Sequence, residues 1–358
     1  FLINKIILVL LFFVLVAFFS VHFNIFGFKD QIYQKYPNLE LRKKLFSKKS
    51  VMEKIYNDYN VMFLPNTQFI RLDLKKIKLN FLPENKNSWF KTFYIEAIKD
   101  KIWIIDMQGN FFEIKIDDVK NINNKKNLEV KTITSNLNTK KVLDSFIHNK
   151  NIYISYVTEK NNCKTLQISF AKMSVDYLDF KNFFTSEECG EHDMYGGKMQ
   201  FFEHKEVEGL LLTAVDVPPH LVGNVNDKPQ NDKSIFGKIL FIDFEKKNHI
   251  VFSRGHRNPS GLYSENNLIL STEHGPWSGD EINKIIFNKN YGWPISSYGE
   301  RYGEELYPLS TYGEKFSEKG NLTPTYHKNH YSLDFEEPIF SFVPALGISE
   351  IIKLPNNF

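Results

Sequence analysis

A series of short runs rich in β-branched and aromatic residues constrains this chain more than any other feature. From about residue 60 onward, Asn, Gly, Asp and Lys separate these runs. Such composition, broken at short intervals by turn-forming residues, predicts β-strands. The nine clearest runs are TFYIEAI (92–98), KIWIIDM (101–107), NFFEIKI (110–116), NIYISYV (151–157), TLQISFA (165–171), GLLLTAV (209–215), GKILFIDF (237–244), HIVFSR (249–254) and LILSTE (268–273).

Several of these runs are joined by tight turns, as in KIWIIDMQGNFFEIKI (101–116) and ILFIDFEKKNHIVFS (239–253). No long amphipathic helix separates them, which disfavours parallel βαβ units and favours an antiparallel all-β domain. The hairpins recur loosely, about 50 residues per group, and this recurrence predicts a β-propeller. The repeat is too degenerate for the blades to be counted from the sequence.

The N-terminal region has a different character. KIILVLLFFVLVAFFSV (5–21) is a nearly continuous apolar run close to the length of a membrane-spanning helix. No small-residue cleavage site follows it, which favours an uncleaved signal anchor over a cleaved signal peptide. We therefore expect an anchor over 1–28, a juxtamembrane stalk over 29–60 and the propeller over 61–358, exported to the periplasmic or extracellular side.

Within the stalk, LELRKKLFSKKSVMEKIYNDY (39–59) carries apolar residues at helical intervals. The pattern fits an amphipathic helix at the membrane surface, and it fits equally well a helix packed on the domain for structural reasons. The formal net charge of +3 is spread without a long basic run, so we expect no nucleic-acid partner. Cys163 and Cys189 lack metal-site spacing, and either form a disulfide in an exported protein or remain separate buried thiols.

One block, Gly255–Pro294, concentrates Gly, Pro, His and Trp: GHRNPSGLYSENNLILSTEHGPWSGDEINKIIFNKNYGWP. Its predicted hairpin, GLYSENNLILSTEH, would bring the polar residues before and after it to one mouth of the sheet, where loops carry sites. Arg257 suits an anionic ligand or a carbonyl that gains charge. Backbone carbonyls at Gly275 and Pro276, with acidic side chains beyond them, could ligate calcium. The alternative is that these groups bond to one another and stabilise long loops.

The ordered pattern GHRNPSGL, STEHGP, GDEIN and NYGWP resembles the glucose/sorbosone dehydrogenase family, soluble sugar dehydrogenases that use pyrroloquinoline quinone (PQQ) on a six-bladed β-propeller. GKILFIDF (237–244), MYGGKMQF (194–201) and EPIFSFVPALGIS (337–349) extend the likeness, which is clear over 195–358 and faint over 60–189. The resemblance implies an all-β, six-bladed β-propeller. We expect its last blade to be incomplete within these residues and an N-terminal transmembrane helix to precede it.

The resemblance also implies roles for individual residues. In the family an Arg-Asn pair contacts the quinone, and two backbone carbonyls hold the calcium that polarises it. An acidic pair helps to organise the calcium or its loop. The matching residues here are Arg257 and Asn258 for the quinone, Gly275 and Pro276 for the metal, and Asp280 and Glu281 for the acidic pair.

The family's catalytic base is a His three residues before the Gly of a Gly-Arg pair. Here the pair is Gly197-Lys198, and Met194 occupies the position of the base. Because Met cannot accept a proton, the alternative base is His192, which a strand or a bulge would have to bring to the same face. The competing interpretation makes His192 a histidine of a surface loop. Ala345 is a second departure, replacing a hydroxyl residue near the cofactor.

These observations predict PQQ- and calcium-dependent oxidation of an aldose sugar or related alcohol, with electrons passed to an unidentified acceptor. Their main alternative is a catalytically inactive propeller that serves as a sugar-binding or protein-interaction module, which Met194 and Ala345 favour. A calcium-dependent hydrolase or lactonase is the third possibility. Only Asp193, Asp216 and the pair Asp280-Glu281 offer carboxylates for it, and the sequence shows no Ser-His-Asp arrangement.

Overall fold

A computed structural model describes residues 61–62, 72–73, 93–121, 128–160, 163–174, 176–190, 196–216, 228–276, 279–299 and 330–354. The chain divides into two compact units, Phe1–Asn80 and Phe81–Phe358. In the first unit, β1 (Val61–Met62) pairs with β2 (Leu72–Asp73). The predicted anchor and stalk lie outside the described residues, and no described helix is both long and apolar enough to cross a membrane.

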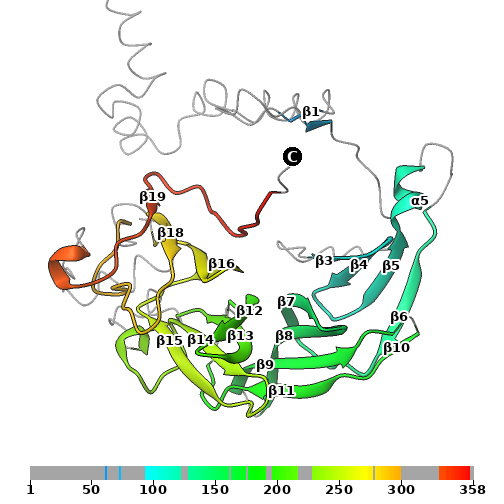
Figure 1. The fold of residues 1–358 in the computed structure, drawn as a ribbon, viewed down its shortest axis with the longest axis horizontal. Helices are drawn as coiled ribbons and strands as arrows, with labels where there is room; N and C mark the ends of the chain where they lie inside the picture. The colour runs from blue at the N-terminus through cyan, green and yellow to red at the C-terminus, as the bar shows by residue number, and fades with distance from the viewer. Residues whose placement is uncertain are drawn as a thin grey trace, which may run out of the picture. The chain divides into compact units, whose positions relative to one another are not determined.

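The described residues of the second unit form four sheets, with strand orders β10-β6-β5-β4-β3, β11-β9-β8-β7, β12-β13-β14-β15 and β16-β17-β18-β19 (Figure 1). Nearly all of the pairings are antiparallel, as the hairpin pattern predicts; β10 pairs with β6 in parallel. The strands are β3 (Phe93–Ile98), β4 (Lys101–Asp106), β5 (Phe111–Lys115), β6 (Lys131–Ser135), β7 (Lys141–His148), β8 (Asn151–Lys160), β9 (Cys163–Lys172), β10 (Tyr177–Leu178), β11 (Lys181–Thr185), β12 (Met199–His204), β13 (Val207–Ala214), β14 (Lys238–Asp243), β15 (His249–Arg254), β16 (Pro259–Glu265), β17 (Leu268–Glu273), β18 (Asp280–Lys284) and β19 (Phe340–Phe342).

All nine predicted runs form strands, and both predicted hairpins form, as β4-β5 and β14-β15. The described helices are short: α5 (Ile116–Lys120) and the 3-10 turns η4 (Lys228–Gln230) and η5 (Tyr331–Leu333). The sheets begin at residues 93, 141, 199 and 259, so the true repeat is somewhat longer than the predicted interval. The all-β prediction is therefore confirmed for the described part of the chain.

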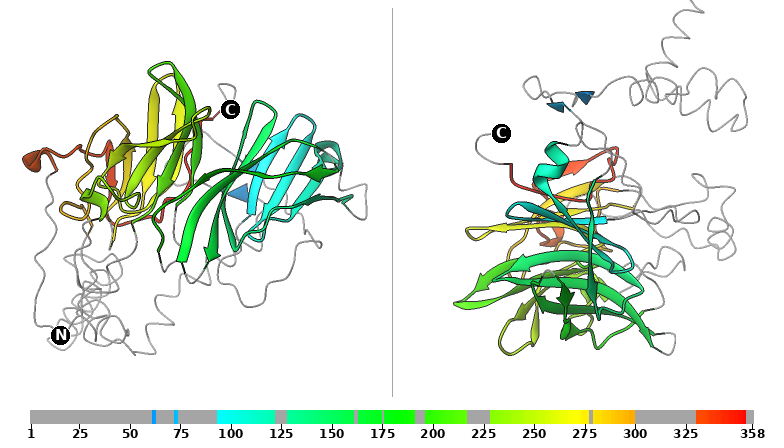
Figure 2. Two further views of the ribbon diagram at one scale, coloured as in Figure 1. Left: turned by 90° about the horizontal axis from the view of Figure 1, so that it is seen from below. Right: turned by 90° about the vertical axis from the view of Figure 1, so that its right-hand side faces the viewer.

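Successive sheets pack against one another through their faces, as the turned views in Figure 2 also show. One core lies between the first and second sheets and includes Trp103 and Ile154. Another joins the second sheet to the third through Leu166 and Leu210, and a further core joins the third to the fourth through Leu211. The first strands β3, β7, β12 and β16 contact one another in that order, which is the blade arrangement of a β-propeller.

The third sheet explains why these strands have apolar residues at successive positions instead of alternating apolar and polar residues. On β13, Leu210 and Leu212 face the core shared with the second sheet, whereas Leu211 faces the core shared with the fourth. Because side chains alternate across a strand, a strand packed on both faces needs apolar residues at every position. Burying a Leu side chain in such a core contributes about 1.5–3 kcal/mol.

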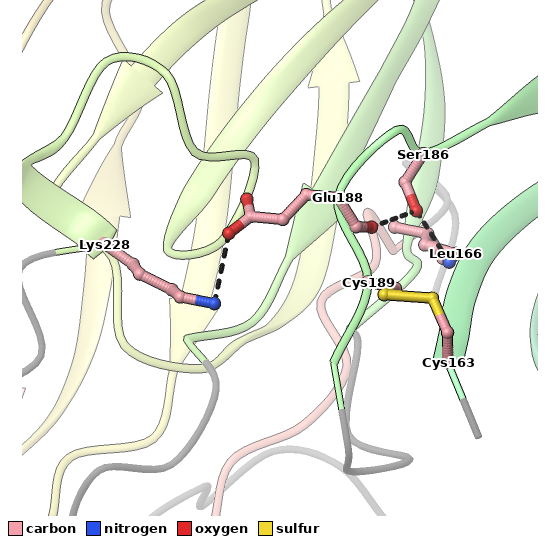
Figure 3. The surroundings of a disulfide bond; sticks show 6 residues. All are labelled: Cys163, Leu166, Ser186, Glu188, Cys189 and Lys228. Carbon is pink, nitrogen blue, oxygen red and sulfur yellow. Dashed lines mark hydrogen bonds and ion pairs between the residues drawn. A yellow bond between two sulfur atoms is a disulfide. The ribbon is translucent and has the colours of Figure 1, made fainter. Parts of the chain in front are cut away.

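Cys163 and Cys189 form a disulfide with a Cα–Cα distance of 5.5 Å, which resolves the alternative that the sequence left open (Figure 3). The bond joins the start of β9 to the segment after β11. In that segment the Glu188 carboxylate accepts hydrogen bonds from the Ser234 hydroxyl at 2.7 Å and the Ile235 amide at 3.0 Å, and it pairs with Lys228 at 3.1 Å. The disulfide therefore secures a connection between the second sheet and the loop that leads into the third.

Candidate active site

The β16-β17 hairpin brings the two polar segments of the Gly255–Pro294 block together, as predicted. Pro259 starts β16 and lies opposite Glu273, the last residue of β17. Just beyond this pair, the His274 amide donates to the Asn258 carbonyl at 3.1 Å. The hairpin thereby places Arg257 beside the His274-Gly275 turn, although the two segments are separated by the whole hairpin in the sequence.

Arg257 is held through both its side chain and its backbone. Its Nη1 donates to the carbonyls of His274 and Gly275, each at 2.8 Å. Its amide donates to a carboxylate oxygen of Glu273, and its carbonyl accepts from the Asp216 amide at 2.8 Å. The position of this guanidinium is consequently fixed by groups from several separate segments.

An aromatic ring supports the same guanidinium. The Cζ of Arg257 lies 5.4 Å from the centre of the Trp293 ring, within the range of a cation–π contact. Trp293 is buried, and its indole Nε1 donates to the carboxylate of buried Asp216 at 2.8 Å. The Trp293 carbonyl accepts from Gln230 Nε2 at 2.6 Å. The sequence block included Trp293, but nothing in the sequence connected it with Asp216.

Glu273 joins Arg257 to a buried histidine. His256 is completely buried, and its Nδ1 lies 3.2 Å from a Glu273 carboxylate oxygen. Its Nε2 lies 2.8 Å from the Ser253 hydroxyl, and its ring stacks on Tyr291 with centroids 4.6 Å apart. These contacts leave Glu273 little freedom to rotate, so the carboxylate remains directed at the Arg257 amide.

A buried amide connects Glu273 to a second carboxyl group. Asn283 Nδ2 donates to both Glu273 and Glu281 at 3.2 Å. Burial, followed by the neighbouring Glu273 charge, raises the pKa of Glu281 to about 8, although the Asn283 hydrogen bond acts in the opposite direction. The Glu281 carboxyl is therefore largely protonated at neutral pH.

Asp280 has a different role from its neighbour. One oxygen accepts from the Gly275 amide at 3.1 Å, and the other accepts from the amides of Leu346, Gly347 and Ile348 at 3.0, 2.6 and 3.3 Å. A carboxylate offers about four acceptor positions, and backbone amides occupy that number here. Asp280 thereby links the Gly275 turn to the segment 346–348. Both acidic residues belong to β18, a strand that is not among the nine predicted runs.

The described side chains enclose a small cavity of about 10 Å³, room for a single water molecule. Its lining includes Arg257, Glu273, Glu281, Trp293 and His330. The cavity thus has the Arg257 guanidinium on one side and the carboxyl groups of Glu273 and Glu281 on another.

Ser253, His256 and Glu273 form a hydrogen-bonded Ser-His-Glu series that the sequence did not reveal. Its geometry resembles a catalytic triad, but Ser253 is 1% exposed and neither it nor His256 lines the cavity. A nucleophile must reach its substrate. The series therefore serves to hold Glu273, and it does not support the hydrolase alternative.

The other sequence-predicted residues divide into two groups. His192 and Met194 lie outside the described residues, as does Asp193. Lys198 is described: its ammonium lies between Asp144 at 3.1 Å and Glu350. Burial raises the pKa of Asp144 to about 6, although the Lys198 charge acts against that shift.

Comparison with known proteins identifies the family of this chain and supports its fold. Residues 91–357 match the Glucose / Sorbosone dehydrogenase family, and the chain belongs to that family. Aldose sugar dehydrogenase YliI of Escherichia coli is 28% identical over 181 residues, which cover 44% of this chain and 45% of that protein. Quinoprotein glucose dehydrogenase B of Acinetobacter calcoaceticus is 46% identical over 55 residues, covering 15% of this chain and 12% of that protein. The chain thus spans less than half the length of the curated relatives it matches.

The fold of this chain also resembles the folds of solved structures. A crystal structure of glucose dehydrogenase aligns with a TM-score of 0.54 and 20% identity, covering 72% of this chain and 73% of that one. The soluble aldose sugar dehydrogenase of Escherichia coli, in its apo form, aligns with a TM-score of 0.51 and 19% identity over the same shares. At this identity the alignments establish the shared fold.

The Arg257 guanidinium is a donor suited to a carboxylate, but the cavity enclosed by the described residues is too small to hold a quinone. Arg257 faces the cavity and lies over Trp293, so its charge is available beside an aromatic surface. Few of the described groups are available to bind calcium. Within the described ranges, no group of three or more His, Cys, Asp or Glu side chains is arranged to hold a metal ion. Backbone carbonyls remain the candidate ligands, because amides already occupy Asp280, although the Gly275 carbonyl accepts a hydrogen bond from the Arg257 guanidinium at 2.8 Å in this structure.

Proposed function

We propose that this protein oxidises an aldose sugar or a related alcohol with bound PQQ. The observation that carries the proposal is the Arg257 guanidinium, fixed by two carbonyls at 2.8 Å and lining the cavity. Family membership over residues 91–357 supports the same activity. PQQ would supply the two-electron acceptor, and the chain would supply the groups that bind and orient it.

Arg257 and Asn258 would hold the quinone, with the guanidinium stabilising negative charge that develops on a quinone oxygen. The carbonyls of Gly275 and Pro276 would hold calcium. His192 is the proposed acceptor of the proton released from the sugar hydroxyl. The proposed setting is a six-bladed propeller tethered by the apolar segment 5–21 and exported to the periplasmic or extracellular side.

The second candidate is an inactive propeller that binds sugar or another protein. Met194 favours it, because the residue at the position of the family's base cannot accept a proton. Both candidates share the fold, so only turnover separates them.

An assay of the full chain with PQQ, calcium, a panel of aldoses and an artificial electron acceptor tests the enzyme proposal. We expect Arg257→Ala to abolish quinone-dependent turnover, whereas Arg254→Ala should retain it, because the Arg254 side chain pairs with Asp232 at the surface. His192→Ala should lower kcat by about a hundredfold or more. Folded wild-type protein without turnover on any sugar would favour the inactive propeller.

A further inference from the structure

Besides its cation–π contact with Arg257, Trp293 makes hydrogen bonds through its indole and its backbone. Its indole N–H donates at 2.8 Å to Asp216, and the backbone amide of the same Asp216 donates at 2.8 Å to the Arg257 carbonyl. Asp216 therefore contacts both the residue that carries the guanidinium and the ring beneath it. Both Asp216 and Trp293 are buried, so these bonds are shielded from competition with water.

The backbone of Trp293 is also held by hydrogen bonds. Its carbonyl accepts from Gln230, and Gln230 and Asn290 exchange two side-chain hydrogen bonds at 3.1 and 2.7 Å. Gln230 ends the η4 turn, whose carbonyls at Lys228 and Pro229 accept from the buried Lys238 ammonium. Trp293 is consequently held through its indole by Asp216, which follows β13, and through its backbone by Gln230, which lies between β13 and β14.

We propose that Asp216 and Trp293 are positioning residues that set the orientation of the Arg257 guanidinium for its ligand. This inference rests on the proposed function, which identifies the ligand as PQQ. Asp216 orients the indole, and the indole face limits the directions in which the guanidinium can lie. The backbone carbonyls of His274 and Gly275 then hold the guanidinium through its Nη1.

The first test follows the side chains directly by NMR of the full chain, without quinone. The chain has four Trp residues, so the indole N–H signals are few, and Trp293→Phe identifies one of them. Arg257→Lys identifies the Arg257 Nε–H signal in the same way. We expect the Arg257 signal to shift in both Asp216→Ala and Trp293→Phe. An Arg257 signal that stays at its wild-type frequency in both variants would overturn the proposal.

The second test measures PQQ affinity by calorimetric titration in the presence of calcium. Asp216→Ala and Trp293→Phe should weaken binding by about tenfold or more. Asp216→Asn keeps a side-chain oxygen for the indole and should remain within about threefold of wild type. Rescue by Asn distinguishes positioning from a direct contribution of the Asp216 charge. Unchanged affinity in both Asp216→Ala and Trp293→Phe would overturn the proposal.

The first sheet offers a matched control. Trp103 is buried and donates its Nε1 to Glu113 at 3.0 Å, the same type of pair in another sheet. Trp103→Phe and Glu113→Ala should affect stability but leave both the Arg257 signal and PQQ affinity unchanged. Equal losses of affinity at the control pair would identify a general effect on the fold and overturn the specific role.

The two tests separate the inference from the proposed function. If wild-type protein binds no PQQ, the proposed function fails, and the Arg257 signal still decides whether Asp216 and Trp293 orient the guanidinium. If Asp216→Ala does not fold, Trp293→Phe provides the decisive comparison, because it retains an aromatic ring and loses only the indole N–H and part of the surface.

Discussion

Lys238 is an unusual residue because its side chain is completely buried on β14. Its ammonium donates to the carbonyls of Lys228, Pro229 and Phe236 at 2.6, 3.0 and 3.0 Å. Burial nevertheless lowers its pKa to about 8, because leaving water disfavours the charged form more than nearby acidic residues favour it. Retaining the proton therefore costs folding free energy at neutral pH.

This shift has a consequence for stability. The unfolded chain holds the proton up to an ordinary Lys pKa of about 10.5, whereas the folded protein releases it near pH 8, so stability rises with pH between these values. Between pH 7.5 and 9.5, we expect the wild type to gain on the order of 2 kcal/mol relative to Lys238→Met. Urea unfolding of both proteins at the two pH values measures the difference, and a constant or falling difference would contradict the assignment.

Much of the site at residue level could be predicted. The spacing of GHRNP and EHGP around a hairpin placed Arg257 beside Gly275, and the two are bonded in the structure. The partnership of Asp216 with Trp293 could not be predicted, because 77 residues separate them and only the packing of the third and fourth sheets brings them together. Likewise, no local signal distinguished buried His256 from an exposed ligand.

At the scale of elements, β18 is a strand that the sequence did not predict. β18 carries Asp280, Glu281 and Asn283, and this composition ordinarily indicates a loop. It becomes a strand because β17 and β19 pair with it on either side. Its polar groups are buried because they bond to the site and to the loop at Leu346. Local propensity is overridden here by pairing partners that are far away in the sequence.

The disulfide between β9 and the segment after β11 also acts at this scale. It closes a loop with a sequence separation of 26, and restricting the unfolded chain to this extent contributes about 3 kcal/mol. We expect the double variant Cys163→Ser/Cys189→Ser to lose stability by roughly this amount in urea unfolding. Reduced wild type should unfold at the same urea concentration as the variant. A variant as stable as oxidised wild type would show that the bond contributes nothing to the fold.

For the whole molecule, the recurrence of hairpins was enough to predict an all-β architecture built from repeated sheets. The four described sheets share three successive cores, so the second and third sheets depend on neighbours for burial of both faces, and the first and fourth for burial of one. The first strands of successive sheets begin at residues 93, 141, 199 and 259, so the interval varies from one sheet to the next. Loop length follows from packing and function, and it has no periodic signature.

The central claim is that a PQQ site surrounds Arg257, and calorimetric titration of PQQ with calcium into the full chain tests it most directly. We predict saturable binding at micromolar concentrations or tighter, lost in Arg257→Ala and retained in Arg254→Ala, whose surface ion pair with Asp232 lies apart from the cavity lining. No binding by folded wild type, or equal binding by wild type and Arg257→Ala, would contradict the account.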